Sequence, residues 1–117
     1  MHLRIFIGAA ALLVAASSGC RRGSAQLDHP AITHHVTIEA MKFSPARTSL
    51  RLGDKIEFKN QDLVPHTVTS KAVPPTFDSK TIPSGQSWTF SADGVGTFRF
   101  RCSFHPTMEG SLVVTPR

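Results

Sequence analysis

Short segments in which apolar and polar residues alternate run through most of the chain after its N-terminal part. Apolar side chains recur there at every second position, as they do on the buried face of a half-exposed β-strand. Turn-forming residues, mainly Gly, Pro, Asn and Asp, separate the segments at intervals typical of all-β domains. The pattern predicts an all-β fold, an antiparallel β-sandwich of about seven to eight strands. The expected strands cover 36–40, 48–52, 55–59, 67–70, 87–90, 97–101 and 111–115.

The first part of the chain has the pattern of a targeting segment. A basic residue, Arg4, precedes an apolar run over 5–16 that is too short for a comfortable membrane span. We expect 1–19 to be a signal peptide and the protein to be exported, to the periplasm or the cell surface. Small residues before Cys20 resemble a bacterial lipoprotein processing site, in which that Cys is lipidated and anchors the protein to a membrane. Ser17 departs from the Leu usual in that motif, and ordinary cleavage nearby is the alternative.

The part that follows divides into a tether and one domain. Residues 20–33 have no periodicity, and we expect them to form a flexible tether. The folded domain is then expected over 34–117. A core of this size is close to the lower limit for folding without help, so a bound metal would contribute usefully to its stability.

Three potential metal ligands share one short loop between two expected strands. Cys102, His105 and Met108 are each three residues apart, and the segments 97–101 and 111–115 lie on either side. A turn between two strands can direct a thiolate, an imidazole and a thioether to one point, and a fourth ligand, His66, lies upstream. Two His, one Cys and a weak axial Met form the ligand set of a blue-copper electron-transfer site.

Each of these residues also has a simpler interpretation. Cys102 could be a buried, inert thiol, Met108 could fill a gap in the core, and His66 and His105 could be ordinary loop or strand-end histidines. An exported protein with an unpaired Cys is open to oxidation unless something protects the thiol, and copper ligation would do so. Zinc is disfavoured because structural zinc sites use Cys and His without a thioether.

The loop from Cys102 to Met108 (Cys-Ser-Phe-His-Pro-Thr-Met) resembles the ligand loop of the small cupredoxins of the plastocyanin and amicyanin type. The resemblance extends to Pro65-His-Thr-Val68 and covers roughly residues 32–115, with further matches at Gly53-Asp54, Phe77-Asp-Ser79 and Gly94-Val-Gly-Thr-Phe98. It implies a Greek-key sandwich that holds one type 1 copper ion. The assignment of His66 as a ligand rests on this resemblance more than on its spacing.

The resemblance also implies how electrons enter and leave. In this family the C-terminal His ligand has a solvent-exposed edge within an apolar patch, so His105 would be the electron port. Val64, Pro65, Phe104, Pro106 and Pro74 would surround it. Such a patch suits transient contacts with redox proteins, a donor and an acceptor.

Three residues depart from the family pattern. Thr67 follows the first His ligand, where Asn often braces the ligand loop, and we expect Thr67 to brace it less. Phe100 stands where Tyr is common. Phe104 stands where Pro is usual, so it supplies a backbone N–H, which we expect to point at the sulfur of Cys102.

Composition and charge narrow the possible functions. The chain has 13 Lys and Arg against 8 Asp and Glu, a net charge of +5, which suits an acidic partner surface or anionic headgroups and equally a generally basic, soluble surface. The basic residues are scattered, so we expect no nucleic-acid binding. The sequence shows no hydrolytic triad, no paired carboxylates and no open coordination position, so we do not expect an enzyme. We expect a monomeric electron carrier; a copper-delivery protein and a metal-free interaction module are the alternatives.

Overall fold

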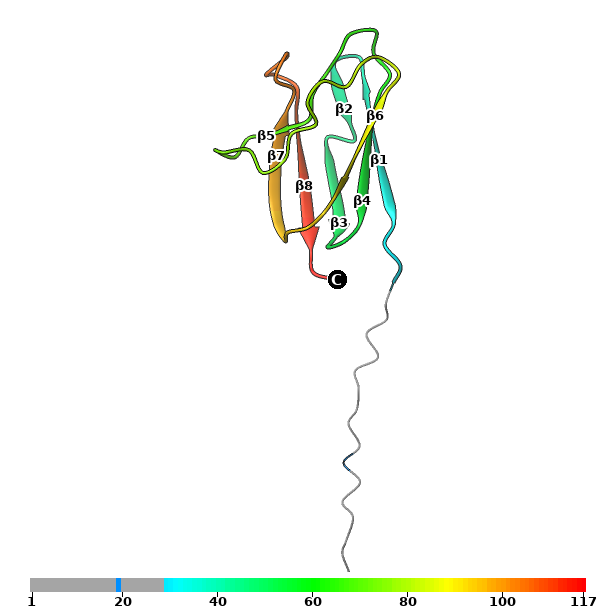
Figure 1. Cartoon of the computed structure of the whole chain (residues 1–117), viewed down its shortest axis with the longest axis vertical. Helices are drawn as coiled ribbons and strands as arrows, with labels where there is room; N and C mark the ends of the chain where they lie inside the picture. Colours follow the sequence, from blue (N-terminus) through cyan, green and yellow to red (C-terminus); the bar gives the residue numbers. More distant parts are fainter. Residues whose placement is uncertain (1–18, 20–28) are drawn as a thin grey trace, which may run out of the picture.

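The computed structural model describes residue 19 and residues 29–117, and within them the chain forms eight strands packed as two layers (Figure 1). The strands are β1 (Thr33–Glu39), β2 (Lys42–Ser44), β3 (Arg47–Arg51), β4 (Lys55–Asn60), β5 (Thr69–Ser70), β6 (Ser87–Ser91), β7 (Gly96–Arg101) and β8 (Glu109–Thr115). One sheet has the order β2-β1-β4-β6 and the other has the order β3-β8-β7-β5. The predicted all-β sandwich of seven to eight strands is confirmed. No helix in these residues is long and apolar enough to span a membrane.

Both sheets are mixed, whereas the sequence pattern predicted antiparallel sheets. β1 pairs parallel with β4, with Thr33 opposite Lys55 at one end and Ile38 opposite Asn60 at the other. β3 likewise pairs parallel with β8, and the other strand pairings are antiparallel. Alternation along a strand reports which face is buried and carries no information on the direction of the neighbouring strand. The predicted fold class was therefore correct, but two of the strand pairs are parallel instead of antiparallel.

The chain turns back after β1 earlier than the sequence suggested. A strand was expected over 36–40 and none over 42–44, but Ala40 and Met41 make a turn, with φ of 52° and 59°, and β2 then pairs with β1. Pro45 lies immediately beyond β2, where its missing N–H costs no ladder bond. The strand expected over 67–70 is likewise shorter, because only Thr69 and Ser70 join the ladder.

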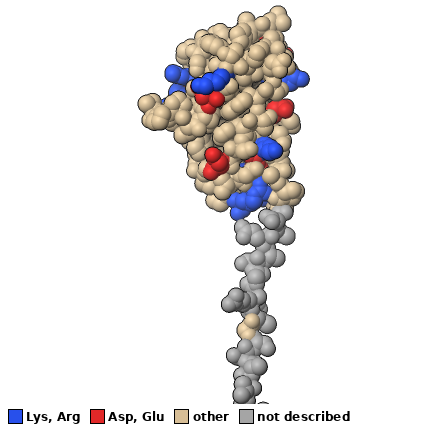
Figure 2. Space-filling model, in the orientation of Figure 1, with Lys and Arg blue, Asp and Glu red and all other residues tan. Residues whose placement is uncertain are grey.

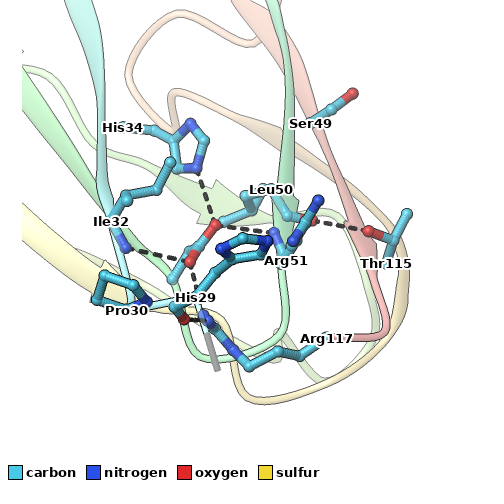
Figure 3. A pocket seen from close by; sticks show the side chains of 10 residues that line it. His29, Pro30, Ile32, His34, Ser49, Leu50, Arg51, Thr115 and Arg117 are labelled. Carbon is cyan, nitrogen blue, oxygen red and sulfur yellow. Dashed lines mark hydrogen bonds and ion pairs between the residues drawn. The ribbon is translucent and has the colours of Figure 1, made fainter. Parts of the chain in front are cut away.

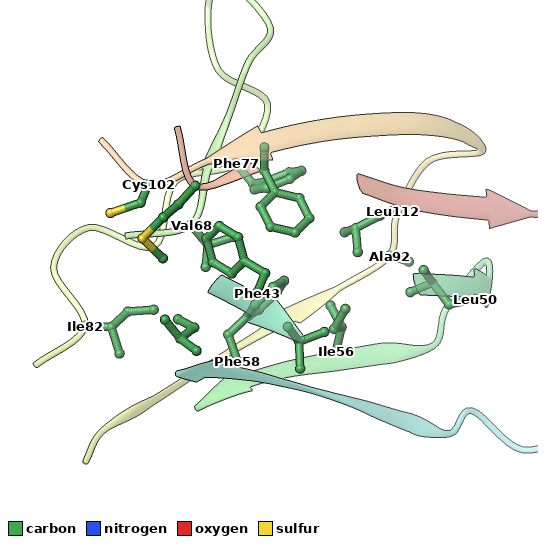
Figure 4. Packing of buried hydrophobic residues seen from close by; sticks show 14 of the residues in the cluster. Phe43, Leu50, Ile56, Phe58, Val68, Phe77, Ile82, Ala92, Cys102 and Leu112 are labelled. Carbon is green, nitrogen blue, oxygen red and sulfur yellow. The ribbon is translucent and has the colours of Figure 1, made fainter. Parts of the chain in front are cut away.

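The core lies between the two sheets and is rich in aromatic rings (Figure 4). The ring of Phe100 from β7 meets those of Phe43 and Phe58 edge-on, with centroid distances of 4.9 Å and 5.4 Å. Ile56 and Phe58 point inward from β4, as predicted. Gly110 allows this packing, because a Cβ on it would lie 2.3 Å from the Phe100 ring and 2.9 Å from the Ala46 carbonyl oxygen.

A buried carboxylate ties together the base of the sandwich, the end at which β1 begins and the chain terminates (Figure 3). Asp54 accepts hydrogen bonds from the Ile32 N–H (3.2 Å), His34 Nε2 (3.0 Å), the Arg51 N–H (3.0 Å) and Arg117 Nη2 (2.8 Å). Burial alone would raise the pKa of Asp54, but these bonds outweigh it and hold the pKa well below its usual range. We call this group of residues the basal clasp.

A depression of about 480 Å³ lies beside the basal clasp, with Ile32 and Leu50 among the residues that line it (Figure 3). The basal clasp also gives a role to His34, whose side chain is partly buried and bonds to Asp54. His35, one residue on, is exposed and lies 3.3 Å from a carboxylate oxygen of Glu57. His34 and His35 therefore bond to carboxylates at the base and do not belong to the group of expected metal ligands.

Candidate metal centre

Three potential ligand atoms converge at the other end of the sandwich. The Sγ of Cys102 lies 3.6 Å from Nδ1 of His66 and 3.7 Å from Nδ1 of His105, and all three atoms lie within 4.8 Å of one another. Cys102 and His66 are completely buried, whereas His105 is partly exposed. Three side chains separated by up to 39 positions along the chain therefore direct lone pairs to one point.

The loop between β7 and β8 is closed on itself by its backbone. The Cys102 N–H donates to the Met108 carbonyl at 3.1 Å, and the Met108 N–H donates to the His105 carbonyl at 2.9 Å. These bonds hold the two ends of the loop together at the point where the antiparallel ladder of β7 and β8 begins. The side chain of Met108 is buried and belongs to the core cluster.

His66 is fixed by a short bridge to a distant segment. Its N–H donates to the Ile82 carbonyl at 3.2 Å, and the Ile82 N–H donates to the His66 carbonyl at 2.7 Å. The buried side chain of Asn60 supports this bridge, because its Nδ2 donates to the carbonyls of Val64 (2.9 Å) and Ile82 (3.0 Å). No local signal in the sequence marks Asn60 as a support for the site.

A carboxylate sets the orientation of the His66 ring. Asp62 accepts a hydrogen bond from Nε2 of His66 at 2.7 Å, and also from the backbone N–H groups of Ala40 (2.7 Å) and Met41 (3.1 Å). Burial alone would raise the pKa of Asp62, but the hydrogen bonds from Met41, His66 and Ala40 outweigh it. The net effect is a lowered pKa, so Asp62 is a carboxylate. A carboxylate only accepts, so it keeps the proton on Nε2 and leaves the Nδ1 lone pair free to bind a metal.

Thr67 links the two segments that supply the ligands. Its N–H donates to the Cys102 sulfur at 3.4 Å, and its hydroxyl accepts a bond from the Ser103 N–H at 2.8 Å and lies 2.9 Å from the Thr69 hydroxyl. Thr67 therefore braces the ligand loop through its backbone N–H and its hydroxyl. The expectation that the Phe104 amide points at the sulfur was wrong, because within residues 29–117 the amide that donates to it belongs to Thr67.

The chemistry of the donor atoms fits copper. A thiolate sulfur suits Cu(I), and imidazole nitrogen suits both copper oxidation states. The structure brings together three of the four predicted ligands, His66, Cys102 and His105, and it places Met108 at the end of the same closed loop. The other histidines of the described residues lie apart from this group.

Exposed apolar residues lie next to His66 and His105 in the sequence. Phe104, between Cys102 and His105, is 51% exposed, and Leu63 and Val64, just before His66, are 94% and 42% exposed. Pro65 and Pro106 are exposed as well. We call these five residues the apolar rim.

Comparison with known proteins agrees with this chemistry. A family model described as a cupredoxin-like domain matches residues 4–114. The amicyanin-alpha of Methylorubrum extorquens is 28% identical over 88 residues, which cover 73% of this chain and 74% of that protein. The plastocyanin of Daucus carota is 32% identical over 87 residues, covering 65% of this chain and 90% of that protein.

Solved structures show the same fold. A Cu(I) amicyanin variant superposes with a TM-score of 0.66 at 23% identity, covering 71% of this chain and 82% of that one. A purple cupredoxin from Nitrosopumilus maritimus gives a TM-score of 0.64 at 24% identity, covering 70% of this chain and 99% of that one.

Proposed function

The chain belongs to the family of cupredoxin-like domains, and on that premise we propose that it carries single electrons between redox proteins. The cofactor is one type 1 copper ion, as in its amicyanin and plastocyanin relatives. We propose His66, Cys102 and His105 as its ligands, with the thioether of Met108 as the fourth. When bound, copper supplies a one-electron couple between Cu(I) and Cu(II).

The convergence of Nδ1 of His66, Sγ of Cys102 and Nδ1 of His105 is the observation that carries this proposal. Backbone bridges, the closed loop and the Asp62 carboxylate fix these side chains from several directions. Ligands held in this way move little when the charge of the site changes, and a small reorganisation favours fast electron transfer. Burial of Cys102 also keeps water and oxidants away from the thiol.

The apolar rim supports the proposal that His105 is the electron port. His105 is the ligand with a partly exposed side chain, while His66 and Cys102 are buried. Exposed apolar residues beside a redox group favour a small interface that forms and dissociates quickly. We therefore expect donor and acceptor proteins to contact the apolar rim in turn.

Copper delivery is the alternative function, and it requires a different kind of metal site. Delivery needs ligands that a recipient can replace one at a time. Here two of the three converging side chains are completely buried, and one of these is held by a hydrogen bond to Asp62. This geometry favours retention of the ion and hence the carrier function.

Export and membrane attachment belong to the same proposal but concern residues 1–18 and 20–28, which lie outside the described residues. Thr33, expected in the tether, is the first residue of β1. We propose that 1–19 are removed as a signal peptide and that Cys20 is lipidated, so that the segment before β1 tethers a monomeric domain to a membrane. Two acyl chains on an N-terminal Cys suffice for stable anchoring. Cys20→Ala should release the protein from membranes or leave it unprocessed, whereas a native protein that is wholly soluble and begins beyond Cys20 would contradict the anchor.

The carrier proposal is tested by spectroscopy and electrochemistry of the copper-loaded protein. We expect an intense blue absorption, a narrow copper hyperfine splitting in the EPR spectrum, and a reversible one-electron potential. Dialysis against a chelator should remove copper slowly. A colourless Cu(II) form with a wide splitting, or rapid loss of copper to the chelator, would favour delivery instead.

A further inference from the structure

The outer face of the β3-β8-β7-β5 sheet carries a group of basic side chains. Arg99 and Arg101 point outward from β7, because Phe98 and Phe100, which alternate with them, point into the core. Arg47 points outward from β3 and shares a cross-strand row with Ser111 and Arg99. Lys71 follows β5, and its N–H bonds to the Arg99 carbonyl. We call Arg47, Lys71, Arg99 and Arg101 the basic face.

Little negative charge offsets the basic face. Its one acidic neighbour on β8, Glu109, contacts Lys71 directly and lies 3.9 Å from Arg99. Beyond β5, Asp78 is paired with Lys80 at 3.3 Å. Within residues 29–117 no ion pair engages Arg47 or Arg101. Figure 2 shows Lys and Arg atoms around an acidic group on the side of the molecule where Figure 1 places β7 and β8.

The outer face of the opposite sheet has a different charge pattern. Its outward positions mix Lys42, Lys55 and Lys59 with Glu39 and Glu57, so positive and negative charges are interspersed. A net positive charge on its own would be an ordinary property of a soluble surface. Here the excess is concentrated on one of the two sheets.

The basic face also borders the candidate metal centre. Arg101 directly precedes Cys102, and Glu109, opposite Arg101 in the ladder, directly follows Met108. Arg99 is one pleat further along β7, about 7 Å away. A partner surface that covers Arg99 and Arg101 can therefore reach the loop that contains Phe104 and His105.

We propose that the basic face binds an acidic surface on the protein with which this chain exchanges electrons. The proposal rests on the proposed electron-carrier function and adds the chemistry of the partner. The basic face would steer and orient the partner, and the apolar rim would supply the close contact beside His105. A protein is favoured over an anionic membrane, because electron exchange requires a redox group to approach His105 while the basic face is engaged.

The test compares two variants that lose the same charge from different sheets. Arg99→Ser/Arg101→Ser removes two positive charges from the basic face, and Lys55→Ser/Lys59→Ser removes two from β4 on the opposite sheet. Blue absorption confirms folding and copper loading, and the reduction potential of each variant is measured so that driving force is corrected for. The probes are cytochrome c, which is basic, and its succinylated derivative, which is acidic.

At low ionic strength we expect the arginine variant to exchange electrons with succinylated cytochrome c about 5–10-fold more slowly than the unmodified protein. The lysine variant should change by less than about twofold, and the difference should fade near 0.5 M salt as screening becomes short-ranged. With native cytochrome c the arginine variant should be faster. Equal effects of the two variants would overturn the proposal.

A binding measurement separates this proposal from the electron-carrier function. Amide NMR shifts of the Cu(I) protein titrated with succinylated cytochrome c should change on β3, β7 and β8, and not on β1 and β4. Failure to exchange electrons even with ferricyanide would defeat the proposed function and leave this titration as the test of the basic face. Shifts confined to the opposite sheet would overturn the proposal. So would shifts on β7 produced by vesicles with phosphatidylglycerol and not by the acidic protein.

Discussion

The two ends of the sandwich each contain a carboxylate–histidine pair, and they use it in opposite ways. At the base, the carboxylate of Asp54 is the central group, and each of its oxygens receives two donors, one of them from His34. At the other end, the imidazole of His66 is central. Its Nε2 is bonded to Asp62, and its Nδ1 faces the sulfur of Cys102.

The difference shows which end requires an additional ligand. The basal clasp pairs one anion with four donors and is complete with protein groups alone. At the metal centre, two imidazole nitrogens face one sulfur, and the thiol proton can be donated to only one of them. A cation at that point would satisfy all three. The base therefore stabilises the metal-free fold, and the ligand end gains stability when metal binds.

Loss of the Cys102 thiolate should have the largest effect. It should remove the stability gained on metal binding, which distinguishes the ligand end from the base. Cys102→Ser is expected to abolish the intense charge-transfer absorption and the rise in melting temperature on copper addition, because the thiolate is the strongest ligand. Visible spectroscopy and calorimetry of the copper-titrated protein measure both. Met108→Gln, the control in the same loop, should keep a blue or green site. A Cys102→Ser protein that stayed blue would show that the ligand assignment is wrong.

Removal of the basal carboxylate should weaken the fold and spare the copper spectrum. Asp54→Ala leaves the Ile32 and Arg51 amides and the side chains of His34 and Arg117 without an acceptor, so we expect a loss of about 2–4 kcal/mol in unfolding free energy. Urea unfolding of the metal-free protein measures it. An unchanged midpoint would show that the basal clasp contributes nothing net, and a lost blue band would show that the two ends are coupled.

Acid should weaken the basal clasp in a defined direction. The folded-state pKa of Asp54 is lowered, so its contribution to stability is full above about pH 4, its unfolded pKa, and decreases as the pH falls further. Urea midpoints measured between pH 7 and pH 2 should therefore fall less steeply for Asp54→Asn than for the unmodified protein. Parallel pH profiles for the two proteins would contradict this assignment.

The support of His66 should be visible in metal affinity. Asp62→Asn is expected to lower copper affinity about 10–100-fold, because outer carboxylates orient ligating histidines and increase their basicity. Loss of a negative charge beside the site should also raise the reduction potential. Competition with a chelator and voltammetry measure these quantities. Asp78→Asn, which removes a carboxylate not bonded to a ligand, is the matched control, and equal effects of both variants would exclude a specific role for Asp62.

The smallest expected effect concerns the link between the ligand segments. Thr67→Val removes the hydroxyl that accepts the Ser103 N–H, and an unsatisfied amide there should cost about 1–2 kcal/mol. The blue colour should remain, because the Thr67 N–H still reaches the sulfur. Thr48→Val, at a buried threonine on β3, is the control in urea unfolding. A loss no greater than that of Thr48→Val would show that the hydroxyl does not brace the loop.

The sequence could predict the ligands because their signal is local. Cys102, His105 and Met108 have a fixed spacing between two alternating segments, and the buried faces of β4 and β7 follow directly from that alternation. The supports could not be found in this way. Asp62 acts through two amides that a positive-φ turn at Ala40 and Met41 presents, and such a turn between non-glycine residues has no clear sequence signature.

The direction of the paired strands could not be predicted from the sequence for a similar reason. The parallel pairs β1–β4 and β3–β8 depend on how distant segments meet, and their alternation is the same as that of antiparallel strands. The basal clasp was also missed, because Asp54 receives donors from both ends of the domain, Ile32 and Arg117. Contacts between chain ends leave no periodic trace in a single sequence.

The pairing of β3 with β8 has a consequence for the order in which the molecule assembles. β8 follows β3 and β7 in the sequence, yet it lies between them in the sheet, so this sheet remains two separate pieces until β8 pairs with both. Pairing across such long loops is slow compared with hairpin closure. The loop from Cys102 to Met108 is anchored by β8, so we expect the ligands to converge only after β8 has paired. A chain truncated before β8 should therefore fail to close the ligand loop.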